Sequence, residues 1–170
     1  QTVIITHDGK VTGITRTDLP TPEEGQIATF ESGSTSGASM QGVYDPDTGR
    51  VIVVYCDADA SNAGKAAAGL VSSDGSITFG SEATWHSGAT ENVGVAYDTA
   101  NDRIVVCGRD NGAANAIYNV GSLVGSTITF GSYGDLSTDG CREVKVAYDT
   151  NADRVLFICS IICYSNIFSS

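Results

Sequence analysis

The sequence predicts an all-β protein of tandem four-stranded antiparallel meanders, the blades of a β-propeller-like array, in a chain that forms only part of a ring. One phrase occurs three times, beginning at Tyr44, Tyr97 and Tyr148, at intervals of 53 and 51 residues. A second phrase, Ser76–Ser81, returns at Thr127–Ser132. Repeats of roughly this period are typical of solenoids, propellers and arrays, in which each unit buries its faces by stacking on its neighbours.

Each unit is expected to open with a β-hairpin. Before the repeated tyrosine, apolar residues alternate with small or polar ones, as in Val93, Val95 and Tyr97, which is the period of a strand. The second strands are expected at 51–55, 104–107 and 155–159, where the sequence is continuously apolar and β-branched, as in strands covered on both faces. The connections, 45–50, 98–103 and 149–154, contain Asp, Asn, Pro and Gly, which favour tight turns.

Two further strands complete each unit. The third strands are expected at 65–71 and 114–120, and the fourth at 76–79 and 127–130. Asp74-Gly75, between the first such pair, is a hairpin signal. Four-stranded meanders repeated at about this interval are the blades of a propeller, whose radial packing leaves only short, protected edges. A β-sandwich is the alternative, but that fold does not require the sequence to repeat.

The array is expected to occupy residues 27–160. It divides into initial strands at 27–43, repeats at 44–96 and 97–147, and a partial repeat at 148–160. Propellers have about four to eight blades, so this array does not close a ring alone. Either the chain is a piece of a longer protein, or copies complete one another's blades, with residues 1–30 supplying strands to a neighbour.

The segments on either side of the array differ from it. Residues 1–26 are expected to form a hairpin of Thr2–Thr6 and Val11–Thr15, followed by a proline-containing linker at Thr17–Gly25. Residues 161–170 form an apolar tail. Residues 1–26 are therefore the candidate assembly strand.

The composition excludes two classes of partner. The net charge is −11 and only nine basic residues are present, whereas binding to nucleic acid requires clustered Lys and Arg. No apolar run approaches the ~18 residues of a membrane span.

The five cysteines show no metal-binding pattern. Cys56, Cys107 and Cys159 fall at near-equivalent points of the second strands, where a buried thiol behaves as a small hydrophobic group. Cys159 and Cys163 have no histidine nearby, so their spacing does not indicate zinc. In an oxidising environment Cys141 is able to pair with Cys163, and the odd total leaves at least one thiol free or intermolecular.

The recurring aspartates indicate turns rather than catalysis. Catalysis needs one asymmetric constellation of groups, while a residue that recurs at the same turn of every unit serves that turn. Ion pairs are expected across the connections, between Asp45 and Arg50, Asp98 and Arg103, and Asp149 and Arg154. A calcium site at Asp45 and Asp47 is a lesser alternative, because the continuation that an EF-hand needs is absent. We therefore expect no enzyme activity, no catalytic residue and no cofactor.

Candidate ligand-binding residues lie in loops that a propeller gathers on one face. They are Asp57, Asp59, Asn62, Lys65, Trp85, His86, Arg109, Asp110 and Asn111. An aromatic ring beside Asp, Asn and Arg side chains suits a sugar, because the ring stacks on the pyranose while polar groups bind its hydroxyls. The alternative for Trp85 is a core position, where it replaces Phe30 of an echoed phrase at 28–33 and 83–88.

The opening phrase YDPDTGRVIVVY and the closing phrase SITFGS, within residues 27–160, resemble repeat arrays in other proteins. Similar arrays occur in tail-fibre and other virion-surface proteins of environmental phages and in bacterial surface proteins. The resemblance implies a non-enzymatic structural or adhesive module of a virion or extracellular surface. Because an unclosed array exposes a strand edge and an apolar face at each end, we also expect the module to self-associate as a ring or filament. The alternative is a glycan-binding lectin whose short chains oligomerise into a closed propeller. A sialidase-type glycosidase is disfavoured, because it needs an arginine cluster and three of the six arginines belong to the repeated turn.

Overall fold

The computed structural model describes residues 28–138 and 140–161, and every regular element in them is a β-strand. The strands are β1 (Thr35–Asp45), β2 (Arg50–Asp57), β3 (Ala63–Val71), β4 (Ile77–Phe79), β5 (Ala83–Asp98), β6 (Arg103–Asp110), β7 (Ala116–Val124), β8 (Thr127–Phe130), β9 (Gly134–Ser137), β10 (Cys141–Asp149) and β11 (Arg154–Ile161). The predicted all-β class is confirmed. The hairpin expected at 2–15, the linker at 17–25 and the tail beyond residue 161 lie outside the described residues.

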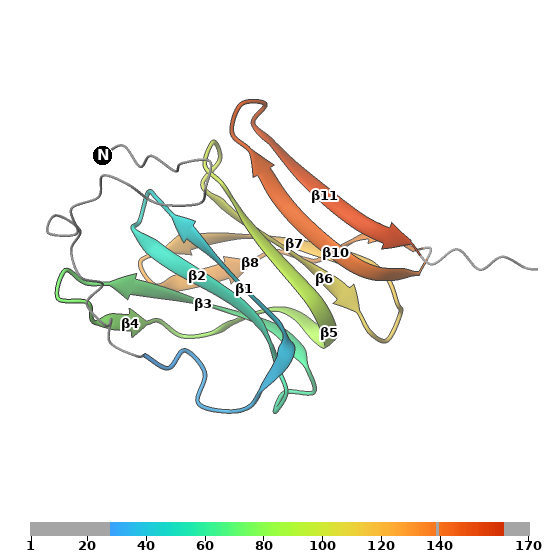
Figure 1. Cartoon of the computed structure of the whole chain (residues 1–170), viewed down its shortest axis with the longest axis horizontal. Helices are drawn as coiled ribbons and strands as arrows, with labels where there is room; N and C mark the ends of the chain where they lie inside the picture. The colour runs from blue at the N-terminus through green and yellow to red at the C-terminus, as the bar shows by residue number, and fades with distance from the viewer. Residues whose placement is uncertain (1–27, 139, 162–170) are drawn as a thin grey trace, which may run out of the picture.

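Two whole four-stranded units follow one another, and the hairpin β10–β11 is the first half of a third (Figure 1). We call these units one, two and three. In unit one, β1, β2 and β3 pair antiparallel, with Val51 opposite both Tyr44 and Gly69. In unit two, the second part of β5 pairs with β6 and β6 with β7, and Ile104 is opposite Tyr97 and Gly121. The sequence repeat is therefore a structural repeat in the same register.

The fourth strand of each unit is divided in two, which was not predicted. β4 pairs with the 69–71 end of β3, and the start of β5 pairs with the 63–66 end. On β7, β8 and β9 divide the two ends in the same way. The breaks fall at 80–82 and 131–133, at the end of the repeated phrase.

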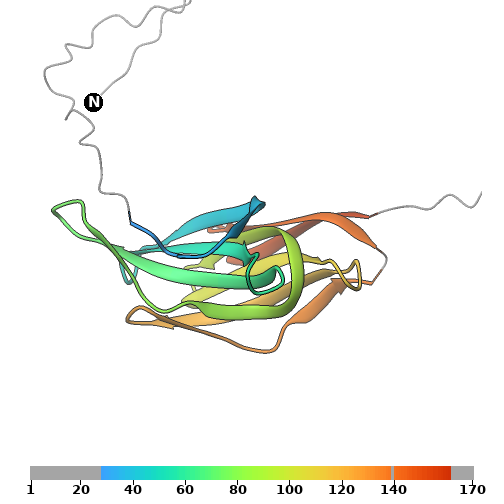
Figure 2. The same ribbon diagram turned by 90° about the horizontal axis from the view of Figure 1, so that it is seen from below.

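β5 carries the sheet from unit one into unit two. Its 16 residues pair with β3 at one end and with β6 at the other. Asn92 has a left-handed φ of 55°, and the register with β6 shifts between Glu91 and Gly94, so the strand turns a corner there. The seven-strand path is strongly curled, an open half-barrel that matches the predicted incomplete ring (Figure 2).

Two apolar layers join the units, and β6 contributes to both. Ile104 and Val106 belong to the layer shared with unit one, while Val105 and Cys107 belong to the layer shared with unit three. Because both faces of β6 are covered, its sequence is continuously apolar.

The aspartate that opens each connection binds its own turn. One carboxylate oxygen accepts the N–H groups two and three residues further on, as in an Asx-turn. These bonds, 2.9–3.2 Å long, run from Asp47 and Thr48 to Asp45, from Ala100 and Asn101 to Asp98, and from Asn151 and Ala152 to Asp149. Burial raises the pKa of Asp45, but its hydrogen bonds with Thr48 and Asp47 outweigh burial and hold that pKa below its ordinary value.

The ion pairs predicted across these connections are not among the salt bridges of the described residues. The Nη1 atoms instead donate to turn carbonyls at 2.9–3.1 Å: Arg50 to Thr48, Arg103 to Asp102 and Arg154 to Asp153. The reason is that each Asx-turn already engages its aspartate. The Thr48 hydroxyl also donates to Asp45, so a calcium ion at Asp45 and Asp47 would have to displace these bonds.

The repeated tyrosine links each unit to the one before it. Tyr148 of unit three accepts a hydrogen bond from the Ala100 N–H of unit two, at 3.3 Å. Burial and the nearby Asp45 carboxylate of unit one raise the pKa of Tyr97 of unit two, while the Tyr97 hydroxyl donates to Asp102 of its own unit at 3.5 Å. Tyr44 has no unit before it among the described residues, and it is 58% exposed against 7% for Tyr97.

Candidate functional site

The loops after the second strands lie at the same end of the molecule as the corner in β5. The Thr90 N–H donates to the Asn62 carbonyl, and the Asn111 N–H donates to the Ala89 carbonyl, both at 2.8 Å. These bonds fix the backbone of neighbouring loops against one another. Asn62 thus contributes its carbonyl, from a left-handed φ of 61°.

Asp57 and Asp110 begin equivalent loops and use one oxygen each to shape them. The Oδ1 atoms accept N–H groups at 2.8–3.3 Å, from Asp59 and Ala60 to Asp57, and from Gly112 and Ala113 to Asp110. The Oδ2 of Asp57 lies 3.9 Å from Lys65 Nζ, and that of Asp110 lies 3.7 Å from His86 Nε2. The structure therefore brings Asp57 to Lys65 and Asp110 to His86. Asp59, in contrast, is bound to the Ser34 N–H at 2.9 Å.

Trp85 lies in the core. It is 2% exposed, and a Cβ added at Gly64 would be only 2.5 Å from its Cε2. Phe30, its counterpart in the echoed phrase, packs edge to face on Tyr55 with ring centroids 5.0 Å apart. The counterpart of Tyr55 in the next unit is Gly108, which lies against Trp85. The first contact therefore joins two aromatic rings, Phe30 and Tyr55, and the second joins a larger ring, Trp85, to a glycine. A ring buried in this way offers no face to a sugar.

A cavity of about 300 Å³ opens beside Trp85, with His86, Asn119 and Tyr133 among its walls. The Tyr133 ring is 51% exposed and stands edge-on to the imidazole of His86, with centroids 4.7 Å apart. Nδ1 of His86 lies 3.0 Å from Thr90 Oγ1, and this hydrogen bond fixes the orientation of the imidazole. The cavity combines a fixed imidazole, a buried amide and an exposed aromatic ring.

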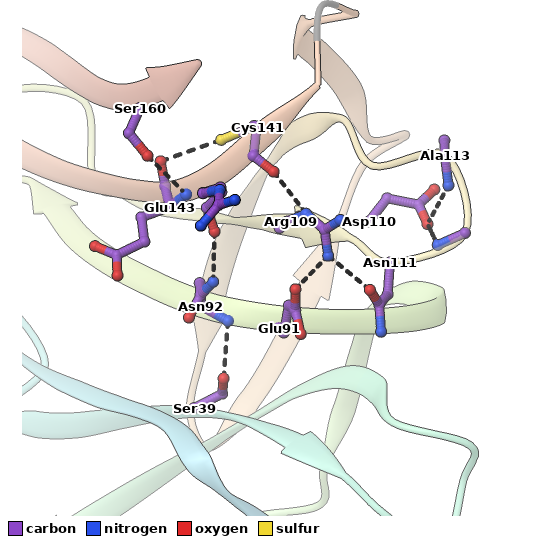
Figure 3. A network of polar contacts seen from close by, with 12 residues as sticks. Ser39, Glu91, Asn92, Arg109, Asp110, Asn111, Ala113, Cys141, Glu143 and Ser160 are labelled. Atoms are coloured by element: carbon purple, nitrogen blue, oxygen red, sulfur yellow. Dashed lines mark hydrogen bonds and ion pairs between the residues drawn. The ribbon is translucent and has the colours of Figure 1, made fainter. Parts of the chain in front are cut away.

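Arg109 holds the loop of unit two to the start of unit three (Figure 3). Its Nε donates to the Cys141 carbonyl and its Nη1 to Asn111 Oδ1, both at 2.6 Å. Nη1 also donates to the Glu91 carboxylate. The predicted residues Arg109 and Asn111 therefore lie together, but their polar atoms are directed at each other and at the next unit.

Lys65 lies in a compact acidic cluster at unit one. Its Nζ is 2.5 Å from Glu82 Oε1, and the Tyr55 hydroxyl is 3.1 Å from both Glu31 and Glu82. One oxygen each of Glu31, Asp57 and Glu82 lie within 4.8 Å of one another. Burial and the hydrogen bond to Glu31 raise the pKa of Tyr55, while the bond with Lys65 lowers the pKa of Glu82. The cluster already contains its own cation.

Three cysteines gather between units two and three. Cys141 Sγ lies 2.9 Å from Cys159 Sγ, and Cys107 belongs to the same apolar layer. Burial raises the pKa of Cys141 and of Cys107 to about 12. Cys163, the pairing partner predicted for Cys141, lies outside the described residues.

Seven residues of these sites were not predicted from the sequence: Glu31, Tyr55, Glu82, Thr90, Glu91, Asn119 and Tyr133. Glu82 and Tyr133 occupy the same position in successive units, directly after the repeated phrase. The sequence signal that could have identified this position is the difference between the two copies, a carboxylate in one and a phenol in the next. Side chains that differ at the break of the fourth strand give each unit its own surface chemistry.

Comparisons with protein-family models, with curated proteins and with solved structures gave no match for this chain. No helix in the described part of the chain has the length and hydropathy that crossing a bilayer requires.

Proposed function

We propose that the chain is a non-enzymatic structural or adhesive module of a virion or extracellular surface, which self-associates through its terminal strands or blades. The observation that carries the proposal is the exposure of apolar side chains at both ends of the array. Met40 and Tyr44 are exposed on β1, and Leu156 and Ile158 on β11. Large exposed apolar patches on a folded domain mark interaction sites.

These two faces are the kind of surface that the units bury inside the molecule. Leu156 and Ile158 match Val105 and Cys107, which are buried between units two and three. Tyr44 matches Tyr97, which is buried against unit one. The end faces of an array of stacked repeats need a cover, because the same faces are buried between units inside the array. Another copy of the chain presents the complementary end face.

Light scattering on the 170-residue chain, over a range of concentrations, tests this. We expect a mass above the 17.6 kDa of one chain, lowered to one chain by Ile158→Glu. Ser73→Glu is the control, because Ser73 is exposed in the turn between β3 and β4. A monomer at every concentration would contradict self-association.

A glycan-binding lectin is the second candidate, and the cavity beside Tyr133 favours it. An exposed aromatic ring next to a fixed imidazole is the arrangement that stacks on a pyranose while polar groups bind its hydroxyls. On a glycan array we expect Tyr133→Ala to abolish a signal that Ser73→Ala, in the exposed turn between β3 and β4, retains. The contact residue of the sugar is then Tyr133, in place of Trp85. A signal unchanged by Tyr133→Ala would refute the assignment of this cavity.

A further inference from the structure

Within the described residues, unit three consists of two strands, β10 and β11. In units one and two the second strands, β2 and β6, each pair on their far edge with a third strand, β3 or β7. Within the described residues β11 pairs only with β10. Its far edge is a row of backbone N–H and C=O groups arranged to accept another strand.

A groove of about 430 Å³ lies where that third strand belongs. Tyr118 and Val120 of β7 form one wall, and Val155 and Phe157 of β11 form another. The positions equivalent to Tyr118 and Val120 in unit one are Ala66 and Ala68, which are fully buried between units one and two. Val120, in contrast, is 40% exposed. Among the described residues, no third strand of unit three lies over this apolar wall.

A sequence similar to the end of a third strand, its turn and the start of a fourth strand occurs near the start of the chain. Residues Ile4–Thr12, IITHDGKVT, match Leu70–Thr78, LVSSDGSIT, which forms the end of β3, the turn and the start of β4. In that turn Gly75 has a left-handed φ of 81° and Asp74 accepts the Ser76 N–H, and Asp8 and Gly9 supply the same two residue types.

A pair of residues between the third and fourth strands is present in this alignment with its large and small members in swapped positions. In both units the third strand has a glycine opposite a phenylalanine of the fourth, Gly69 with Phe79 and Gly121 with Phe130. By the alignment with unit one, Val3 takes the glycine position and Gly13 takes the phenylalanine position. The pair keeps one large and one small member, as a packed strand pair requires.

We propose that residues 1–15 of a second copy fill this groove and add the third and fourth strands to β10–β11. This proposal rests on the self-association of the proposed function and names its junction. The register of β2 with β3 places Val3 opposite Val155 and Ile4 opposite Arg154. Ile5 takes the place of Val71 in unit one, which is 48% exposed, and of Leu123 in unit two, which packs against the layer between units one and two.

The geometry selects a second copy over the same chain. Residues 1–15 precede unit one, so the unit that they complete stands before unit one, whereas β10–β11 follows unit two. Completion within one chain would close a ring of three blades, fewer than the four or more of propellers. Two copies joined head to tail supply about six blades, within the usual range of four to eight. Closed rings are one of the two products of such heterologous contacts.

The test is the mass of the full chain and of two single variants. Light scattering is expected to give two copies, twice the 17.6 kDa of one chain. Val3→Asp places a charge in the inserted strand, and Val120→Asp places one in the groove, so each variant alone is expected to be a monomer. Thr12→Asp is the matched control, because its counterpart Thr78 is exposed, and it is expected to leave the mass unchanged.

Mixing the two variants separates this junction from a folding defect. The Val120→Asp chain has an intact strand and the Val3→Asp chain has an intact groove, so an equimolar mixture is expected to form pairs that neither variant forms alone. Self-association that survives Val3→Asp would overturn this junction and leave the proposed function standing. A parent chain that is monomeric at every concentration would overturn both. A mixture that stays monomeric would also count against the proposal.

Discussion

The contact between Trp85 and Gly64 gives the sharpest test of how the units pack. All three atoms nearest to a Cβ added at Gly64 belong to the indole, at 2.5, 2.7 and 2.9 Å. Gly64→Ala therefore overpacks the core, which costs about 1–3 kcal/mol of unfolding free energy. With Trp85→Phe the crowding is relieved, and the same alanine should stabilise by about 0.5–1 kcal/mol through its lower unfolded-state entropy. The predicted coupling between the two positions is therefore about 1.5–4 kcal/mol.

Urea unfolding followed by far-ultraviolet circular dichroism measures this double-mutant cycle without relying on tryptophan fluorescence. Gly42→Ala is the matched control, because its added Cβ would meet only the Ile52 carbonyl, at 3.6 Å, and should change stability by less than about 1 kcal/mol. An equal cost of Gly64→Ala with phenylalanine and with tryptophan at position 85 would show that the indole does not crowd position 64.

Three further results are expected. Trp85→Ala should lower the unfolding free energy by about 3–5 kcal/mol, measured by urea unfolding, because it empties a core position; a change below about 1 kcal/mol would contradict the core assignment. The pKa of Asp45 is held below its ordinary value in the folded chain, so its contribution is present at neutral pH and is lost as the pH falls through the folded pKa. The urea midpoint should therefore fall less between pH 7 and pH 3 in Asp45→Asn than in the parent chain, and equal falls would oppose this. Burial raises the pKa of Cys56 to about 11 and of Cys107 to about 12, so maleimide at pH 7 should label both only after unfolding, as peptide mass spectrometry would show; rapid labelling of the native chain would refute it.

The hairpins were predictable because their determinants are local. The repeated tyrosine, the turn and the apolar second strand lie within about a dozen residues, and pairing such as Tyr97 with Ile104 needs only that segment. The division of the fourth strand is different. It depends on which residues of β3 pair with β4 and which pair with β5, and no residue near the break at 80–82 indicates that choice.

The ion pairs failed for a reason that sequence spacing hides. Asp45 and Arg50 are opposite each other across the connection, so charge alone suggests a pair. The nearer N–H groups of Asp47 and Thr48 reach the carboxylate first, and the arginine binds a carbonyl instead. Local backbone bonds of this kind compete with longer-range contacts at every turn that begins with aspartate.

The two interpretations of Trp85 could not be separated in sequence, because its burial depends on glycines far along the chain. Gly64 and Gly108 make the space that the indole fills, and neither belongs to the echoed phrase. The sequence did contain the comparison, since Tyr55 stands where Gly108 stands one unit later.

Comparison between units also separates residues that maintain the fold from surface residues that vary. Positions that keep their chemistry in every unit, such as Asp45 with its counterparts Asp98 and Asp149, form the same hydrogen bonds in each and explain the fold. Positions that change, such as Glu82 and Tyr133, lie at the surface beside different neighbours. A partner that recognised the repeat itself would contact every unit alike, whereas at this position unit two has an exposed ring and unit one has a carboxylate. The cavity beside Tyr133 and the two open end faces are therefore where mutations should change binding without changing the fold.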